Sequence, residues 1–250
     1  MTYARLTRLS CTLLCCAAAI QASAFTVNAF PGCLHEALAD MPDDETRLEI
    51  TGSIDVRDFE PLRGLTGVEK LDLSEVRIAE HASPTPLFPG RTWFEADCLP
   101  PYSLFETSFT DIILPASIVR IEEGALASSG ISRLEVPAKV KEIGDYAFYN
   151  ASSLTAVTLP VSLGKIGRWC FNGCSALKDL NLEGTSVTEL PDYCFSGTYA
   201  LKKLDTSRIL TVGREVFSGS GLTYAFFPKA REFAPFALYG MEALEGVSVP

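Results

Sequence analysis

The sequence is poor in the residue types that most catalytic and metal sites require. It contains two histidines in 250 residues, His35 and His81. Neither has the spacing of a metal site or lies near a G-x-S-x-G nucleophile motif, and there is no glycine-rich phosphate loop. The acidic run at residues 43–45 lacks the spaced ligands of a calcium loop. We therefore expect no enzyme activity, no cofactor and no metal.

Basic residues are scarce relative to acidic ones. The chain has 21 Lys and Arg against 31 Asp and Glu, a formal net charge of -10. A protein this acidic has no electrostatic attraction to nucleic acid or anionic lipid, so we expect neither as a partner. Beyond the first 24 residues, no apolar run is long enough to span a bilayer.

Residues 1–24 have the features of a signal peptide. Arg5 and Arg8 form a basic start, and a short apolar run extends to Ile20. The segment Ala22-Ser23-Ala24 fits the small-x-small cleavage pattern. We therefore predict an exported protein whose mature chain begins at Phe25.

A repeat of 21 to 24 residues runs through the rest of the chain. A first ladder of apolar residues is Leu99, Ile121, Ile143, Ile166, Leu190, Val212 and Phe233. A second ladder, five residues later each time, is Leu104, Leu126, Phe148, Phe171, Phe195, Phe217 and Leu238. Repetition at this period predicts a solenoid, in which each unit buries its apolar side chains only by stacking on its neighbours.

One coil, residues 155–177, shows how the unit is expected to fold. Val157 and Leu159 alternate with polar or small residues as in a half-buried strand, and Pro160 ends that strand. Gly167 suits a sharp turn, and Phe171 fills the interior. The equivalent strand pairs are Leu48/Ile50, Leu71/Leu73, Ile112/Leu114, Leu134/Val136, Leu180/Leu182, Leu204/Thr206, Ala225/Phe227 and Val247/Val249. We predict a parallel sheet on one face and short helical or 3-10 turns on the other.

Two of these units carry a family resemblance. "LTAVTLPVSLGKIGRWCFNGCSAL" and "ISRLEVPAKVKEIGDYAFYNASSL" resemble the BspA-like leucine-rich repeats of bacterial surface proteins. The segment 48–78 resembles the first coils of such proteins from Bacteroidales-type bacteria. The resemblance implies a secreted or cell-surface, outer-membrane-associated protein, and some members of the family are adhesins.

The two ends of the repeat array depart from the pattern. In residues 25–47, Leu34, Ala37 and Leu38 have helical spacing and Pro42 cannot continue a helix, so we predict a short capping helix. The solenoid is expected over 48–250. Its last coil stops at residues 247–250, so we expect either a fragment of a longer protein or an end that something else covers.

Residues 79–98 interrupt the repeat with a proline-rich, aromatic loop. Phe88, Arg91, Trp93 and Phe94 are candidate partner-binding residues, because loops on rigid scaffolds often carry function and Trp and Arg are frequent in hot spots. The alternative is that these aromatic side chains fold back and patch the core where the coil is irregular.

The strand face offers a second candidate site. Tyr224 and Phe226 are neighbouring aromatic residues at outward-facing strand positions and could anchor a partner. Alternatively, they pack laterally against Tyr239 or the chain end.

Five cysteines follow the predicted leader: Cys33, Cys98, Cys170, Cys174 and Cys194. Cys170 and Cys194 occupy the slot that Ala147 fills in another coil, which favours small buried residues. A disulfide between these two coils is a weaker alternative, and a three-cysteine zinc site is weaker still.

The residues thus predict a non-catalytic, exported repeat protein. The first functional hypothesis is adhesion through binding of a host or bacterial surface protein or a matrix protein. The alternative is a passive spacer or the amino-terminal part of a larger surface protein whose function lies elsewhere.

Overall fold

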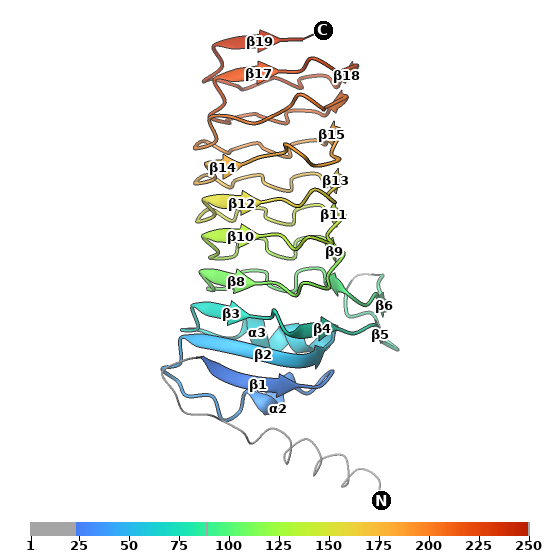
Figure 1. The fold of residues 1–250 in the computed structure, drawn as a ribbon, viewed down its shortest axis with the longest axis vertical. Helices are drawn as coiled ribbons and strands as arrows, with labels where there is room; N and C mark the ends of the chain where they lie inside the picture. The colour runs from blue at the N-terminus through green and yellow to red at the C-terminus, as the bar shows by residue number, and fades with distance from the viewer. Residues whose placement is uncertain (1–23, 89, 250) are drawn as a thin grey trace, which may run out of the picture.

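The computed structural model describes residues 24–88 and 90–249, and in them the chain winds into a stack of coils (Figure 1). Successive coils follow one another along the long axis, from the blue amino-terminal end to the red carboxyl-terminal end. The repeat solenoid predicted from the two ladders is therefore confirmed. The predicted signal peptide lies outside the described residues except for Ala24.

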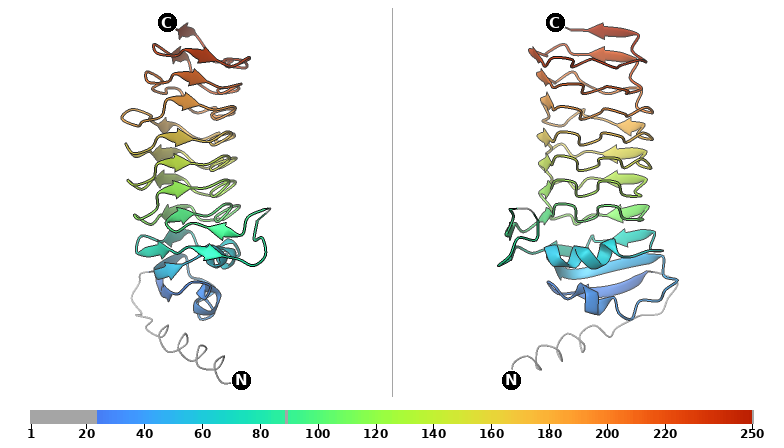
Figure 2. Two further views of the ribbon diagram at one scale, coloured as in Figure 1. Left: turned by 90° about the vertical axis from the view of Figure 1, so that its right-hand side faces the viewer. Right: turned by 180° about the vertical axis from the view of Figure 1, so that it is seen from behind.

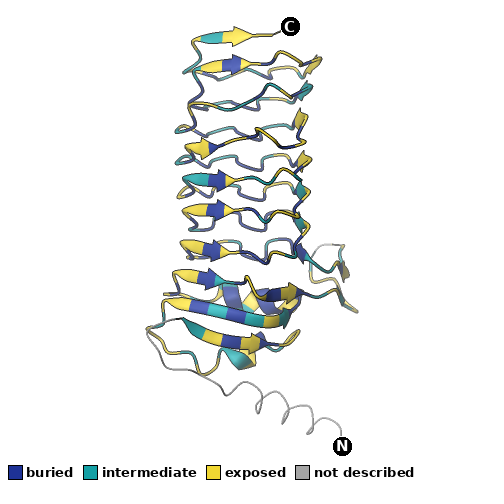
Figure 3. Cartoon of the chain, in the orientation of Figure 1, coloured by how far each residue is buried: buried dark blue, intermediate teal, exposed yellow. Residues whose placement is uncertain are grey.

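One face of the stack is a parallel sheet built from one strand per coil. Its strands, in spatial order, are β1 (Phe25–Ala29), β2 (Arg47–Ile54), β3 (Lys70–Asp72), β8 (Asp111–Ile113), β10 (Arg133–Glu135), β12 (Ala156–Thr158) and β14 (Asp179–Leu180). A further strand, β4 (Val76–Ile78), also pairs with β2. In the three-residue strands β3, β8, β10 and β12 the middle residue is buried while its neighbours face outward, because side chains alternate along a strand (Figure 3).

A second side of the stack carries two-residue parallel strands. They are β7 (Cys98–Leu99), β9 (Arg120–Ile121), β11 (Glu142–Ile143) and β13 (Lys165–Ile166), followed by a separate group of β15 (Glu189–Leu190), β16 (Thr211–Val212) and β18 (Glu232–Phe233). Each pairs the first-ladder residues of adjacent coils, such as Ile143 with Ile166.

The segments that carry the second ladder form the short turns predicted there, and within the described residues none of them extends into a helix. In the coil of Phe171, Trp169 has φ of 57° and Gly173 has φ of 72°. Two left-handed residues four positions apart break any helical run, because helices require consecutive right-handed residues. Successive coils join these turns by backbone hydrogen bonds, such as Phe171 N to Cys194 O at 2.9 Å.

Helices are confined to the amino-terminal end in the described residues. They are α2 (Leu34–Ala37), a 3-10 turn η1 (Val56–Asp58) and α3 (Phe59–Arg63). The helix predicted near Leu34 is present, but the strand β1 before it was not predicted. β1 pairs in register with β2, Val27 opposite Ile50, so residues 25–29 extend the sheet by one strand.

A column of phenylalanine rings fills the interior of the central coils. The ring centroids of Phe148 and Phe171 are 5.0 Å apart, those of Phe171 and Phe195 5.4 Å, and those of Phe195 and Phe217 5.9 Å, all nearly parallel. These four side chains are fully buried. The four phenylalanines in the middle of the second ladder thus form a continuous ring stack along the axis of the solenoid.

The regular stack is broken at one coil, and the strand predicted at Leu204 and Thr206 is absent there. The first sheet ends at β14 and resumes as β17 (Tyr224–Phe226) with β19 (Gly246–Ser248), and the second side is broken between β13 and β15. The sequence spacing between the two sides of a coil varies here. It is eight positions from Leu182 to Leu190 and six from Thr206 to Val212, compared with seven from Leu159 to Ile166. These unequal spans put the two sides of the coil out of step, so its ladder bonds cannot all form.

We expect Phe171→Ala to destabilise the protein by about 3–5 kcal/mol, because it removes a ring from the middle of a packed column. Denaturant unfolding followed by circular dichroism would measure the loss. Val161→Ala is the control, since Val161 is 74% exposed and should change stability little. Equal stability of the Phe171 variant and the wild type would contradict the ring column.

Gly167→Ala should cost about 1–3 kcal/mol through overpacking. A Cβ atom at Gly167 would overlap the backbone nitrogen of Asp145 in the preceding coil. Gly164→Ala is a matched control two residues before Ile166, because the nearest atom to its Cβ would be Lys141 O at 3.9 Å. Thermal melts of both variants test this, and a similar melting temperature for the two would argue against close backbone contact at Gly167.

Candidate binding surfaces

The interrupting segment 79–98 forms a β-hairpin that projects from the stack beside the amino-terminal coils (Figure 2). Its strands β5 (His81–Ala82) and β6 (Trp93–Phe94) are antiparallel, and an isolated bridge joins Phe88 and Arg91 nearer the tip. The segment predicted as a loop is therefore an ordered ribbon.

The four candidate residues of this hairpin have different environments. Trp93 is 49% exposed, whereas Phe94 is 2% exposed. Phe88 is half-buried and its ring packs edge-on against Phe94 at 5.7 Å. Phe94 is therefore not accessible to a partner in this structure, and its burial matches the alternative in which the aromatic side chains fold back. Trp93 is the aromatic residue of the hairpin that faces solvent.

Arg91 attaches the hairpin to the stack. Its guanidinium contacts the Glu122 carboxylate at 2.6 and 2.8 Å and donates to the Trp93 carbonyl oxygen at 3.1 Å. It also lies over the Phe94 ring at 5.0 Å. Glu122 is buried in the adjacent coil, so this ion pair is shielded from water. Arg91 positions Trp93, and its charge is already paired within the chain.

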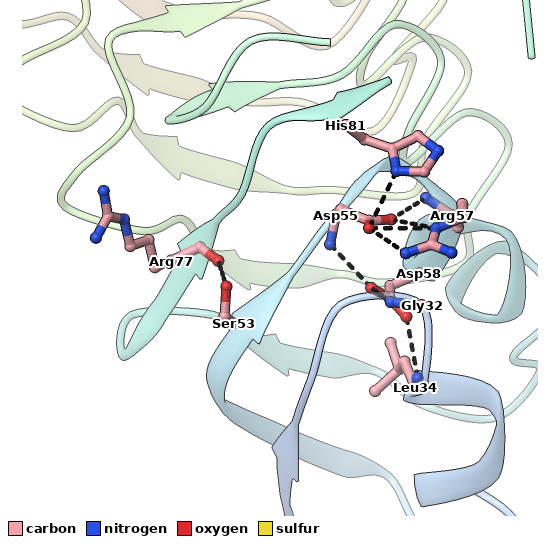
Figure 4. A network of polar contacts seen from close by, with 8 residues as sticks. All are labelled: Gly32, Leu34, Ser53, Asp55, Arg57, Asp58, Arg77 and His81. Atoms are coloured by element: carbon pink, nitrogen blue, oxygen red, sulfur yellow. Dashed lines mark hydrogen bonds and ion pairs between the residues drawn. The ribbon is translucent and has the colours of Figure 1, made fainter. Parts of the chain in front are cut away.

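A polar junction supports the other end of the hairpin (Figure 4). Asp55 is 2% exposed and accepts hydrogen bonds from Arg57 N at 2.9 Å and Arg57 Nη2 at 2.6 Å. His81 of β5 places Nδ1 3.5 Å from the same carboxylate. Burial alone would raise the pKa of Asp55, but the hydrogen bonds and charge of Arg57, with His81, lower it overall. A charged Asp55 therefore connects the second coil to the hairpin.

Asp58 continues this junction toward the first coil. Its buried carboxylate accepts from Gly32 N at 2.7 Å, Leu34 N at 3.0 Å and Asp55 N at 2.8 Å. Backbone N–H groups that face the interior need such acceptors. Leaving a buried N–H unpaired costs more free energy than a typical hydrogen bond contributes to stability. The two carboxylates thus hold the first coil, the second coil and the hairpin together.

A row of aromatic residues lies on the turns of the solenoid and was missed by the sequence analysis. An aromatic residue lies three positions after five of the seven first-ladder residues. We call these residues the aromatic row; they are Tyr102, Tyr146, Trp169, Tyr193 and Phe236. All five have left-handed backbone, with φ from 50° to 64°. Aromatic residues rarely adopt this conformation, so each carries backbone strain. The signal that would have revealed the row is its fixed spacing from the first ladder.

The rings of the aromatic row stack on one another between coils. Tyr146 and Trp169 are 6.2 Å apart at 13°, and Trp169 and Tyr193 are 4.1 Å apart at 18°. At the hairpin end, Phe88 stacks on Tyr102 at 6.3 Å. The hairpin therefore contacts Tyr102, the first member of the aromatic row, and Glu215 separates the last member, Phe236, from Tyr193.

The row has a gap at Gly124, which occupies the same slot between Tyr102 and Tyr146. The Tyr102 ring lies where a Gly124 side chain would be, so the slot tolerates only glycine. Tyr102 Oη donates to Glu123 at 2.7 Å. Burial, with the Glu123 carboxylate, raises the pKa of Tyr102 to about 12. The phenol therefore stays protonated as a donor at neutral pH.

The second predicted site, on the strand face, is exposed. Tyr224 is 65% and Phe226 53% exposed on β17. The Tyr224 ring lies against Gly246 of the neighbouring strand β19. Tyr239 instead packs edge-on against Phe236 at 6.0 Å. The aromatic pair is thus accessible, but it lies on the sheet rather than with the aromatic row.

Among the described residues, Cys33, Cys98, Cys170, Cys174 and Cys194 form no disulfide with one another. Cys170, Cys174 and Cys194 are fully buried, and burial raises the pKa of each above its ordinary value. Cys98 is also buried, and burial is the main cause that raises its pKa to about 11. These thiols fit the small-buried-residue interpretation, and their protonated forms are poor nucleophiles.

The described residues contain neither a cluster of metal ligands nor a membrane-spanning helix. Within residues 24–88 and 90–249, no group of three or more His, Cys, Asp or Glu side chains could hold a metal ion. The same part of the chain contains no helix that is long and apolar enough to cross a membrane.

The fold has parallels among solved structures. A leucine-rich repeat protein from Bacteroides ovatus aligns with 80% of this chain at 18% identity and a TM-score of 0.52. The alignment covers 61% of that protein, so this chain spans less than two thirds of its length. A leucine-rich repeat protein from T. pallidum aligns with 78% of this chain and 80% of its own, at 20% identity and a TM-score of 0.52. No curated protein sequence matches significantly.

These parallels and the geometry define a leucine-rich repeat solenoid with little helix. The sequence profile of the BspA type leucine rich repeat region matches residues 98–240 in six copies. That match covers more than half of the chain, so the protein belongs to the BspA-type leucine-rich repeat family. The family resemblance of the two repeat units is therefore confirmed.

Acid should remove the stabilisation that Asp55 provides. Because the pKa of Asp55 is lower when folded, its contribution is full above the unfolded-state pKa of about 3.9 and is lost as pH falls through the folded pKa. We expect Asp55→Asn to cost about 2 kcal/mol at pH 7 and less near pH 3. Urea unfolding at both pH values measures this difference.

Asp111→Asn is the control for that experiment. Asp111 is an exposed carboxylate that lies 3.9 Å from the Lys70 ammonium, so its removal should cost little at either pH. A penalty for Asp55→Asn that stayed the same between pH 7 and pH 3 would show that its charge does not support the junction.

Proposed function

We propose that this chain is an exported, non-catalytic protein that binds another protein through the hairpin and the aromatic row. The observation that carries the proposal is the row itself. Five aromatic side chains hold a backbone conformation that costs of order 1–3 kcal/mol each. The same slot holds Gly124 with φ of 59° and Glu215 with φ of 47°, so the repeat itself sets this conformation, and the sequence places an aromatic side chain on it in five of the seven coils.

The surface has the composition of a protein-binding site. Trp93 is half-exposed on a hairpin that Arg91 and His81 hold against the stack, so little ordering is needed when a partner binds. Tyrosine and tryptophan, which combine a large apolar ring with a polar tip, are the residues most enriched in such interfaces. The hairpin and row supply both residue types along one line.

The location and role of the protein follow from the leader and the family. The predicted signal peptide supports export, and membership of the BspA-type family supports a secreted or cell-surface, outer-membrane-associated protein. We infer that the partner is a host or bacterial surface protein or a matrix protein, and that binding it mediates adhesion. Tyr224 and Phe226 provide a second, separate contact surface in this proposal.

The test is binding of the mature chain, residues 25–250, to a panel of matrix proteins and whole cells at physiological salt. We expect saturable binding to at least one member and an affinity at least tenfold weaker for Trp93→Ala combined with Tyr146→Ala, since each decade corresponds to about 1.4 kcal/mol. Both side chains are exposed, so the variant should remain folded, which circular dichroism would check.

Val161→Ala is the control on another surface, and Tyr224→Ala tests the second contact surface separately. Loss of binding only in the Tyr224 variant would move the site to the strand face. No saturable binding to the panel, or equal binding by all variants, would favour a passive spacer or a part of a larger surface protein.

A further inference from the structure

The outward face of the first sheet carries two columns of side chains. In each coil from β2 to β14, two outward residues lie two positions apart, on either side of a buried residue. Because the strands pair in register, the residues at the first of these positions form one column and those at the second form another. The first column is Arg47, Lys70, Asp111, Arg133, Ala156 and Asp179, and the second column is Glu49, Asp72, Ile113, Glu135, Thr158 and Asn181.

The charges of the two columns are linked coil by coil. The second column is acidic only where the first column is basic, and the three pairs of this kind are Arg47/Glu49, Lys70/Asp72 and Arg133/Glu135. In the other three coils the residue of the second column is uncharged. Beyond β14 the equivalent positions hold a fourth basic and acidic pair, Lys203 and Asp205, and then the aromatic pair Tyr224 and Phe226.

These charges are largely left unpaired by the chain itself. Within the described residues, Arg133 and Glu135 are exposed and form no ion pair, and the pair on β2 likewise forms none. Lys70 has its ammonium 3.9 Å from Asp111 of the next strand, and both side chains are about half exposed. Opposite charges that have no partner on their own molecule can pair across an interface with another one.

A second copy of the chain fits the two columns in one orientation. A twofold axis that is parallel to the stack and lies between two sheet faces sets each coil opposite the same coil of the other copy and exchanges the columns. Arg133 of each copy then faces Glu135 of the other, and no coil places like charges opposite each other. A contact of this kind is self-complementary, as a twofold dimer requires. An axis along the strands would instead set the second column, which has acidic residues and no basic ones, against itself.

The shape of the molecule allows this contact along the sheet. The coils lie along a nearly straight axis, and the hairpin projects on the side of the two-residue strands, so it leaves the first sheet uncovered (Figures 1 and 2). With about 4.8 Å between neighbouring strands, the six strands from β2 to β14 span about 24 Å. Farther along, Tyr224 of each copy faces Phe226 of the other, so the exposed aromatic pair is covered as well.

We propose that two copies of this chain associate face to face through the first sheet, about a twofold axis parallel to the stack. Both amino-terminal ends then lie at the same end of the dimer, and the hairpin and the aromatic row stay outside the contact. A dimer therefore presents two copies of that surface, which raises the avidity for a partner that reaches both. The proposal does not rest on the proposed function, because self-association is measured without any ligand.

Sedimentation velocity of the mature chain, residues 25–250, measures the association. The series extends to about 1 mM protein, because a contact this narrow is expected to be weak. At about 0.15 M salt the Debye length is about 8 Å, so the net negative charge of distant parts is screened while charges in contact still pair. We expect the sedimentation coefficient to rise from that of a monomer toward that of a dimer. A chain that stays monomeric throughout overturns the proposal.

Charge reversal tests the orientation of the two copies. Arg133→Glu and Glu135→Arg each set like charges opposite each other twice in the dimer, and each should weaken self-association at least about tenfold. An equimolar mixture of the two single variants should associate again, because every facing pair then has opposite charges. The double variant, which exchanges the two charges within one chain, should also associate as the wild type does.

Arg231→Glu is the matched control for Arg133→Glu. It makes the same change of charge at an exposed residue next to β18, away from the first sheet. It should self-associate as the wild type does. Circular dichroism checks that all the variants are folded.

The variants also define the results that count against the dimer. Equal loss in Arg133→Glu and Arg231→Glu would show only a general effect of charge. Self-association that neither Arg133→Glu nor Glu135→Arg weakens would place the contact on another face. A mixture of the two folded single variants that stays monomeric would exclude the twofold arrangement.

Discussion

The structure depends on in-register stacking of coils, because no coil is large enough to bury its own apolar side chains. Phe171 is buried only because Phe148 and Phe195 lie above and below it at 5.0 and 5.4 Å. The same constraint keeps the backbones close, which is why glycine occupies position 167. The interior residues therefore pack against neighbouring coils. Residues that could contact a partner lie on the turns, on the strand face or at the interruptions of the stack.

The two interruptions of the stack differ in origin: one is an inserted hairpin, and the other is a change of spacing within the repeat. The hairpin at 79–98 is inserted between regular coils, and it is held by the Arg91–Glu122 pair and the Asp55 junction instead of by ladder bonds. The break near Leu204 is a change of step within the repeat, and the first sheet ends there at β14. The first adds a fixed aromatic ribbon, and the second interrupts the strands on both sides of the stack.

Much of the fold was predictable, but only part of the candidate site was. The second ladder identified Phe148, Phe171 and Phe195 as interior residues, and all three are fully buried. The hairpin was expected as a loop, and Phe94 was assigned to the surface although it is buried, because an insertion has no periodicity from which to infer its direction. The aromatic row was missed because its members differ in residue type, although their spacing is as regular as that of the ladders.

The sequence by itself determined the solenoid, its coil length and its interior, since period and apolar pattern specify which side chains stack. It also placed Trp93 and Phe226 outside the repeated core. Only the tertiary structure decided that Phe88 stacks on Tyr102 and Tyr146 on Trp169, and that the first sheet ends at β14. Both depend on how far each coil advances relative to the next, a distance set by hydrogen bonds and packing between coils and not by any single repeat.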